Sequence, residues 1–286
     1  MNPKLKILIS MSVFGTVGIF VRFIPLPSAL IAFCRGVLGC LFLLILVALT
    51  GRRLSLPDIK RNFRILAVSG AFIGINWILL FESYRYTTVA IATICYYLAP
   101  AFMTLASPLV GEKLNGKKLG CIGVALVGMV FVSGVLQGNQ EGSLTGVLLG
   151  VGAAVFYASV ILLNKKLSPI GAYDKTLCQL AMASLVIAPY LLASGGIRFG
   201  GMTALGWAML LIVGIVHTGI SYALYFGAIK DVNAQTAAIL SYLDPVLSIL
   251  LSALILREKL DVFSVIGAVL ILGSALYSEL PGRKMS

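Results

Sequence analysis

The segment Tyr96-Tyr97-Leu98-Ala99-Pro100 lies inside a long apolar run, and Ser241-Tyr242-Leu243-Asp244-Pro245 resembles it 145 positions later. Residues around both segments also match at this offset: Phe81 with Phe226, Ala92 with Ala237, and Ile94 with Ile239. Downstream, Glu112-Lys113-Leu114 recurs as Glu258-Lys259-Leu260 after a one-residue insertion. The order of these matches indicates two copies of one unit, and an internal repeat constrains the architecture of the whole chain.

The composition places the chain in a membrane. Its 286 residues are 59% hydrophobic and 11% charged, whereas a soluble domain carries about 25% charged residues. Apolar runs of about 20 residues are long enough to cross a bilayer as helices. These runs are apolar on every side, which argues against a transmembrane β-barrel. We therefore predict an all-α integral membrane protein with ten transmembrane helices, near residues 5–24, 27–50, 63–84, 88–110, 117–136, 143–165, 175–195, 203–228, 233–256 and 261–280.

The formal net charge of +12 could indicate nucleic-acid binding or a membrane orientation signal. Lys and Arg are concentrated in the cytoplasmic loops of membrane proteins. If the N-terminus is cytoplasmic, sixteen of the 22 basic residues fall on the cytoplasmic side, five fall outside, and Arg35 lies within a span. This asymmetry predicts a multi-pass protein of a bacterial plasma (inner) membrane, with both termini cytoplasmic and no nucleic-acid partner.

The sequence gives no sign of a cofactor or metal. Its five cysteines are scattered through apolar runs without a C-x-x-C pair, which argues against a disulfide framework or a metal site. Gly111-x-x-x-x-Gly116-Lys117 resembles a phosphate-binding loop, but Lys118 replaces the required Ser or Thr and no strand precedes it. We therefore expect no ATP-driven transport and no enzymatic activity.

A polar hinge at residues 137–142 is the expected boundary between the repeats, which gives residues 1–138 and 142–286. Each repeat has five predicted spans. Because five is odd, the second copy enters the bilayer from the opposite side. Inverted repeats of this kind recur in secondary transporters, where the substrate site lies near the bilayer midplane between the repeats.

The chain resembles the EamA-type permeases of the drug/metabolite transporter superfamily. The residues that carry the resemblance are Arg35, Tyr84-x-Tyr86-Thr87-Thr88, Tyr97-Leu98-Ala99-Pro100, Leu243-x-Pro245 and the Glu-Lys-Leu signatures at 112 and 258. The resemblance implies export of amino acids, their derivatives, drugs or other small metabolites. It also implies a central cavity lined mainly by spans one, three, four, six, eight and nine. Two residues depart from the pattern: Asp244, where relatives carry an uncharged residue, and Glu82, where a small residue is common.

Asp244 is the sharpest functional signal in the sequence. It lies about twelve residues into span nine, near the midplane for a helix that rises 1.5 Å per residue. An ionised carboxylate at that depth is costly and marks a functional pathway. Ser241 and Ser248 would share one helix face with it. We expect Asp244 to couple protons or to anchor a substrate ammonium group; the alternative is a structural carboxyl held by a nearby hydroxyl.

Polar and aromatic residues in the middle of several spans predict a pocket. Aromatic walls with a few polar groups suit an organic ligand, and the faces of the rings also attract cations. The alternative for each residue is simple packing with a satisfied hydroxyl. The expected substrate-binding residues are Asn76, Trp77, Tyr96, Tyr97, Tyr222, Tyr242 and Asp244.

Other residues are candidates for coupling or gating. Pro100 and Pro245 interrupt helical hydrogen bonding, which would create either a bend for rocking or a static kink. Arg35 could pair with Glu82 or contact a substrate carboxylate; the alternatives are a structural ion pair or a side chain that extends to the membrane interface. Glu82 could act as an outer gate or simply lie at the interface. His217, the single histidine, could relay protons or pack in the core.

These observations predict a secondary active transporter that exports small metabolites such as amino acids by alternating access, with possible coupling to protons. A multidrug or organic-cation carrier would use the same pocket. Two readings of other classes are a membrane enzyme acting on lipid-linked substrates and a channel. The expected partners are a small-molecule substrate and the lipid bilayer, and the chain would act as a monomer or homodimer.

Overall fold

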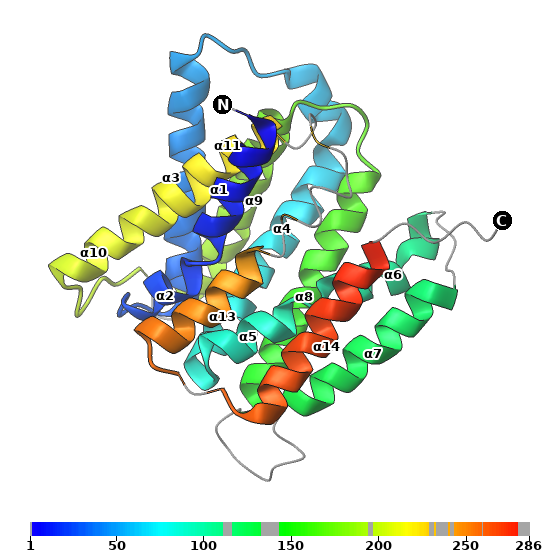
Figure 1. Cartoon of the computed structure of the whole chain (residues 1–286). Coiled ribbons are helices and arrows are strands. Elements are labelled where there is room, and N and C mark those ends of the chain that lie inside the picture. Colours follow the sequence, from blue (N-terminus) through cyan, green and yellow to red (C-terminus); the bar gives the residue numbers. More distant parts are fainter. Residues whose placement is uncertain are drawn as a thin grey trace.

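The computed structural model describes residues 2–110, 116–132, 143–193, 197–228, 232, 240, 243–258 and 260–279, and helices dominate this part of the chain (Figure 1). The helices of the first repeat are α1 Pro3–Phe14, α2 Val17–Arg22, α3 Ser28–Leu49, α4 Leu56–Tyr86, α5 Val89–Tyr96, α6 Ala99–Leu105, the 3₁₀ turn η1 Ser107–Val110, and α7 Gly116–Val132. Those of the second are α8 Leu144–Lys165, α9 Ala172–Ala193, α10 Ala204–Leu211, the π-helix η3 Ile212–Ile220, α11 Ser221–Ala228, α13 Leu243–Ile255 and α14 Val262–Glu279.

The helical segments coincide with the predicted spans. Six are long and apolar enough to cross a membrane: Pro3–Arg22, Ser28–Leu49, Leu56–Tyr86, Leu144–Lys165, Ala172–Ala193 and Ala204–Tyr225. Four shorter apolar helices, Val89–Met103, Leu119–Val132, Leu243–Ile255 and Val262–Ser274, fall on the remaining predicted spans. The prediction of an all-α, multi-span membrane protein is confirmed.

The packing reproduces the internal repeat. Helix α4 of the first repeat packs on α8 of the second, and their counterparts, α11 of the second repeat and α1 of the first, also pack on each other. The contact between α4 and α9 has its counterpart in the contact between η3 and α3. In the same way, the contact between α5 and α8 has its counterpart in the contact between α13 and α1. Two further pairs, α3 with α9 and α7 with α14, each join a helix to its own counterpart, and Figure 1 shows α7 and α14 side by side. The two repeats therefore exchange equivalent contacts across the molecule.

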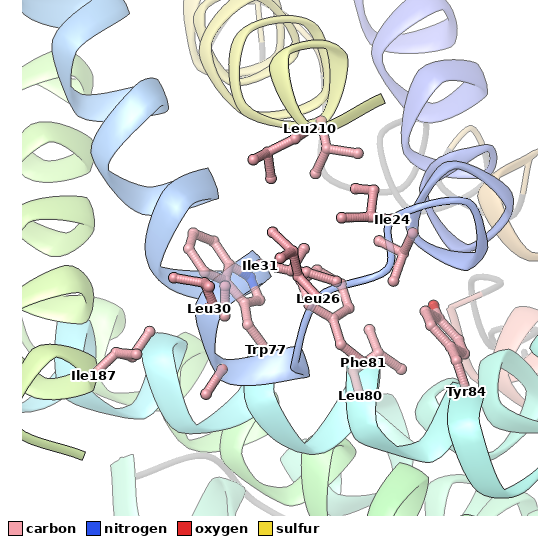
Figure 2. Packing of buried hydrophobic residues seen from close by; sticks show 14 of the residues in the cluster. Ile24, Leu26, Leu30, Ile31, Trp77, Leu80, Phe81, Tyr84, Ile187 and Leu210 are labelled. Atoms are coloured by element: carbon pink, nitrogen blue, oxygen red, sulfur yellow. The ribbon is translucent and has the colours of Figure 1, made fainter. Parts of the chain in front are cut away.

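A large apolar cluster holds α3, α4 and α9 together. Leu30, Trp77, Phe81 and Leu180 are among its buried members, and Figure 2 shows Trp77, Leu80 and Phe81 of α4 beside Leu30 and Ile31 of α3. A second cluster joins α5, α7, α8 and α14. These two clusters pack the helices that carry the candidate site residues described below.

Within the residues that the structure describes, three spans are interrupted in mid-course. The first is interrupted by a turn at Gly15 and Thr16, between α1 and α2. The fourth is broken at Tyr97 and Leu98, between α5 and α6. The break puts Pro100 in the first turn of a new helix, where its missing N–H removes no hydrogen bond. The eighth contains the π-helix η3, and π-helical turns are frequent at functional sites.

Candidate functional site

Asp244 lies where interrupted segments meet. It is in the first turn of α13, and its carboxylate accepts a hydrogen bond from the Tyr97 hydroxyl at the α5–α6 break. At the α1–α2 break, a Cβ atom added to Gly15 would lie 2.6 Å from the Asp244 carbonyl oxygen. Only glycine therefore allows this close approach. Irregular backbone at membrane depth is typical of transporter substrate sites.

Four tyrosines from three helices surround this point. The Tyr96 ring lies 6.1 Å from Tyr97 and 5.3 Å from Tyr157, measured between centroids. Tyr96 and Tyr157 are both within electrostatic reach of Asp244 and of Tyr222 on α11. Tyr157 is 41% exposed, and Tyr96, Tyr97, Tyr222 and Asp244 remain partly accessible. The structure thus brings four predicted site residues together, and all four remain partly exposed.

Asn76 fixes the orientation of this aromatic wall. The side chain is buried, and its amide donates to the Ala153 carbonyl at 2.6 Å. It also forms a side-chain hydrogen bond with Tyr96. The residue therefore ties α4 to α8 and positions the Tyr96 ring. Its place beside the site agrees with the sequence, while direct contact with substrate stays a prediction.

Arg35 has different partners from those expected. Its Nε donates to Thr218 Oγ1 at 2.8 Å, and its Cζ lies 4.4 Å from the centroid of Trp77 and 5.6 Å from that of Phe81. The expected pairing with Glu82 is wrong, because Glu82 pairs with Arg85 at 3.5 Å instead. Adjacent residues on a helix point in different directions, so Phe81 faces the guanidinium and Glu82 does not.

The charge of Arg35 nevertheless reaches the site. The side chain is buried in the membrane-spanning region, and its charge acts on both Asp244 and Tyr222. Trp77, predicted to line the pocket, lies in the apolar cluster of α3 and α4 (Figure 2) and supports the guanidinium through its ring face. Arg35 therefore supplies a positive potential near Asp244 without a direct ion pair between them.

His217 links η3 to the α1–α2 break. Its Nε2 lies 2.8 Å from Thr16 Oγ1, and its Nδ1 lies 3.3 Å from the Ile212 carbonyl oxygen. The Thr16 hydroxyl also donates to the Val13 carbonyl at 2.7 Å. Each ring nitrogen of His217 therefore has an oxygen partner, and the tautomer decides which nitrogen donates. The Phe20 ring covers the imidazole at a centroid distance of 4.9 Å. These contacts give His217 a packing role between two interrupted helices, while proton relay stays a prediction.

A polar cluster at the predicted outer end joins the two repeats, and we call it the outer clasp: Arg22, Thr87, Val89, Ser252 and Glu258. Arg22 Nη2 donates to Glu258 Oε1 at 3.1 Å and to the Thr87 carbonyl at 2.8 Å. Glu258 Oε2 accepts from the Val89 backbone N–H at 2.9 Å and also from Ser252 Oγ. Val89 begins α5, where unsatisfied N–H groups favour a carboxylate.

Two of these features, Glu258 and Tyr157, have only a partial signal in the sequence. Glu258 stood out as part of a repeated Glu-Lys-Leu signature, without a role. Tyr157 lies in mid-span, like the tyrosines that were singled out. Tyr242 and the Pro100 side chain lie outside the described residues, and Pro245 is buried in the first turn of α13.

The family model for EamA-like transporters matches residues 4–134 and 144–278. The chain belongs to the EamA-like transporter family. This confirms the family resemblance drawn from the sequence and establishes a multi-pass membrane protein of a transporter family.

Curated proteins and solved structures resemble this chain. It is 32% identical to the uncharacterized transporter YxxF of Bacillus subtilis (strain 168), over 93% of this chain and 86% of that protein. It is 29% identical to the "Probable amino-acid metabolite efflux pump" of Escherichia coli (strain K12), over 65% of this chain and 66% of that one. A crystal structure with 18% identity aligns with a TM-score of 0.65, covering 96% of this chain and 94% of the other, and supports the fold alone.

Proposed function

We propose that this EamA-family protein is a secondary active transporter that exports small amine-bearing metabolites, such as amino acids or their derivatives, by alternating access. The observation that supports it most directly is the Asp244 carboxylate, which is bound by Tyr97 and lies near the rings of Tyr96 and Tyr157. A carboxylate at membrane depth pairs favourably with a cation. The name of the Escherichia coli relative supports an amino-acid metabolite as the substrate class.

In the proposed cycle, Asp244 binds either a substrate ammonium group or a proton. The tyrosine rings add attraction for the cation through their faces. A substrate carboxylate would be drawn toward the positive potential of Arg35, whose charge acts on the same region. Because one carboxylate cannot hold a proton and an ammonium together, inward proton movement would drive outward substrate movement.

The outer clasp would gate the outer end of the pathway. Arg22 and the Thr87–Val89 segment belong to the first repeat, whereas Ser252 and Glu258 belong to the second. Relative movement of the repeats would separate Glu258 from Arg22 and from the start of α5. The clasp in its bonded form then corresponds to a state that is closed on that side.

An organic-cation or multidrug carrier is the second candidate. It is favoured by the same carboxylate and aromatic rings, and it would not need Arg35. The family and the two relatives named above, a transporter and an efflux pump by name, favour transport over the enzymatic alternative. The two transport candidates differ in whether the substrate must carry a carboxylate.

Counterflow in proteoliposomes tests the proposal. The compounds would be amino acids, their N-acetyl forms without an ammonium group, and their methyl esters without a carboxylate. We expect counterflow of the free amino acids but not of the N-acetyl forms, and a large reduction of it in Asp244→Asn. Weaker counterflow of the esters than of the free amino acids would favour the amino-acid candidate, and equal counterflow would favour the organic-cation candidate. Asp261→Asn is the matched control, because Asp261 is exposed and caps α14 through the Ser264 N–H. Full counterflow by Asp244→Asn would refute the proposed site.

A further inference from the structure

A second hollow lies between α3 and α11, on the predicted cytoplasmic side. It has a volume of about 890 Å³. Its α11 side is formed by Ala223 and Leu224, after Ile220 of η3, whereas Tyr222 on the same helix faces the Phe14 ring at 5.5 Å. The hollow is therefore on another face of α11 from the candidate substrate site. Its lining residues are Lys6, Phe42, Leu46, Val47, Arg52, Arg53, Leu54, Ile170, Gly171, Ala172, Tyr173, Asp174, Ile220, Ala223 and Leu224.

One end of this hollow is basic. Lys6, Arg52 and Arg53 line it together with a single carboxylate, Asp174. Asp174 is largely buried and accepts a hydrogen bond from the Ser55 backbone N–H at 3.4 Å. Within the part of the chain that the structure describes, none of the three basic residues forms an ion pair. This basic end, which we call the entrance of the hollow, therefore carries an excess of positive charge that can bind an anion.

The Arg52 guanidinium is held at this entrance. Its Cζ lies 4.7 Å from the centroid of the Tyr173 ring. Such stacking orients the planar guanidinium while leaving its N–H groups available to an anion. Phosphate is a group that arginine recognises well through paired N–H donors.

The other walls are apolar and continue into the membrane. Phe42 and Leu46 are one turn apart on α3 and face Ile220, Ala223 and Leu224 across the hollow. Nearby residues of α3 face outward: Ile45 is 58% exposed and Leu49 is 81% exposed. In a membrane protein such exposed apolar side chains contact lipid. A ligand that fits this hollow needs an anionic head and a hydrocarbon tail.

We propose that the hollow binds an anionic phospholipid from the leaflet on the side of the N-terminus. Lys6, Arg52 and Arg53 would contact the phosphate, and one acyl chain would lie between α3 and α11. Basic pockets between transmembrane helices on the cytoplasmic side bind anionic headgroups in this way. This site is separate from Asp244 and is independent of the proposed substrate. A soluble phosphate would use only the basic end and leave the apolar walls empty.

The test measures lipid binding to the detergent-purified full chain by thermal shift and by native mass spectrometry. The probes are phosphatidylglycerol, phosphatidylcholine, sn-glycerol 3-phosphate and inorganic phosphate. We expect phosphatidylglycerol to raise Tm by about 3 °C near saturation, with retained lipid visible in the mass spectrum. The other three probes should leave Tm within about 1 °C of its starting value.

Matched variants locate the binding. Arg52→Gln with Arg53→Gln should abolish the phosphatidylglycerol shift, and so should Ala223→Phe, which fills the apolar wall. The control is Lys60→Gln with Arg64→Gln, which removes two exposed charges from α4 outside the hollow. The control and Asp244→Asn should both keep the shift, so failure of the substrate site leaves this result intact.

Three results would overturn the proposal. The first is an equal response to phosphatidylcholine, which would mean unselective lipid binding. The second is an equal response to glycerol phosphate or inorganic phosphate, which would assign the site to a soluble anion. The third is an equal loss of the phosphatidylglycerol shift in the Lys60 and Arg64 control variant. This result would mean that phosphatidylglycerol responds to the general surface charge and not to this hollow. Retained lipid in the mass spectrum distinguishes a loss of binding from a variant that is merely less stable.

Discussion

Arg22 and Glu258 form an ion pair of 3.1 Å that joins the two repeats across 236 positions of sequence. The Glu258 side chain is 11% exposed, and its other carboxylate oxygen binds the first N–H of α5. Glu258 therefore binds both the Arg22 guanidinium on α2 and the N-terminal N–H of α5. A contact that connects the repeats at one end of the molecule is suited to respond when they move.

The first prediction concerns this ion pair. Arg22→Gln, Glu258→Gln and the double variant form a double-mutant cycle. We expect each single variant to lower Tm by about 2 °C or more. The double variant should lose less stability than the sum of the two single variants, by a coupling energy of about 1 kcal/mol. Glu82→Gln with Arg85→Gln is the control, because that pair is within one helix and more exposed. The control cycle should give a coupling energy of about 0.3 kcal/mol. Equal coupling energies in the two cycles would show that the Arg22–Glu258 pair is no stronger than an ordinary exposed ion pair.

The second prediction concerns proton coupling. If Asp244 exchanges a proton for substrate, transport by the unmodified chain will change with pH, since protons compete for the carboxylate. Asp244→Asn cannot bind a proton there, so its remaining transport should be flat across the same pH range. Initial rates in proteoliposomes at a series of pH values give the comparison. A variant that transports with the full pH dependence would remove Asp244 from the coupling mechanism.

The third prediction concerns Gly15. Gly15→Ala would place a Cβ 2.6 Å from the Asp244 carbonyl oxygen and 3.0 Å from Leu247 Cβ. Both neighbours belong to α13, so the backbone must shift, at a cost of about 1–3 kcal/mol. Tm should fall and counterflow should weaken.

Gly120→Ala is the matched control for Gly15, because a Cβ at Gly120 meets nothing within 4 Å and the residue lies inside α7. Removing a glycine from an open helical position stabilises by about 0.5–1 kcal/mol. The two substitutions should therefore move Tm in opposite directions. If both substitutions raised Tm, or both lowered it, Gly15 would not be a point of close approach between α13 and the α1–α2 break.

The fourth prediction concerns Arg35. Arg35→Lys keeps the charge but loses the planar stack on Trp77 and the geometry of the bond to Thr218. We expect a destabilisation of about 1–2 kcal/mol, measured as a lower Tm. If the amino-acid proposal holds, substrates with a carboxylate should lose more counterflow than methyl esters do. Equal losses would limit Arg35 to a structural role.

The sequence by itself determined the membrane class, the ten apolar segments, the repeat and the family. These properties are local: a run of about 20 apolar residues needs a bilayer, whatever surrounds it. The Tyr97–Pro100 motif likewise marked an interruption correctly, because proline cannot donate a backbone hydrogen bond. The midplane position of Asp244, which rests on counting residues along one span, stays a prediction.

The tertiary structure alone decided which side chains meet. Arg35 finds Thr218 at a separation of 183 positions rather than Glu82, Glu258 becomes part of the outer clasp, and Tyr157 joins Tyr96. The basic hollow likewise combines residues from both repeats. Such partners depend on how each helix is rotated about its axis and on which neighbours it packs against. Spans that are apolar on every side leave that rotation open, and the packing of small residues and buried hydrogen bonds fixes it.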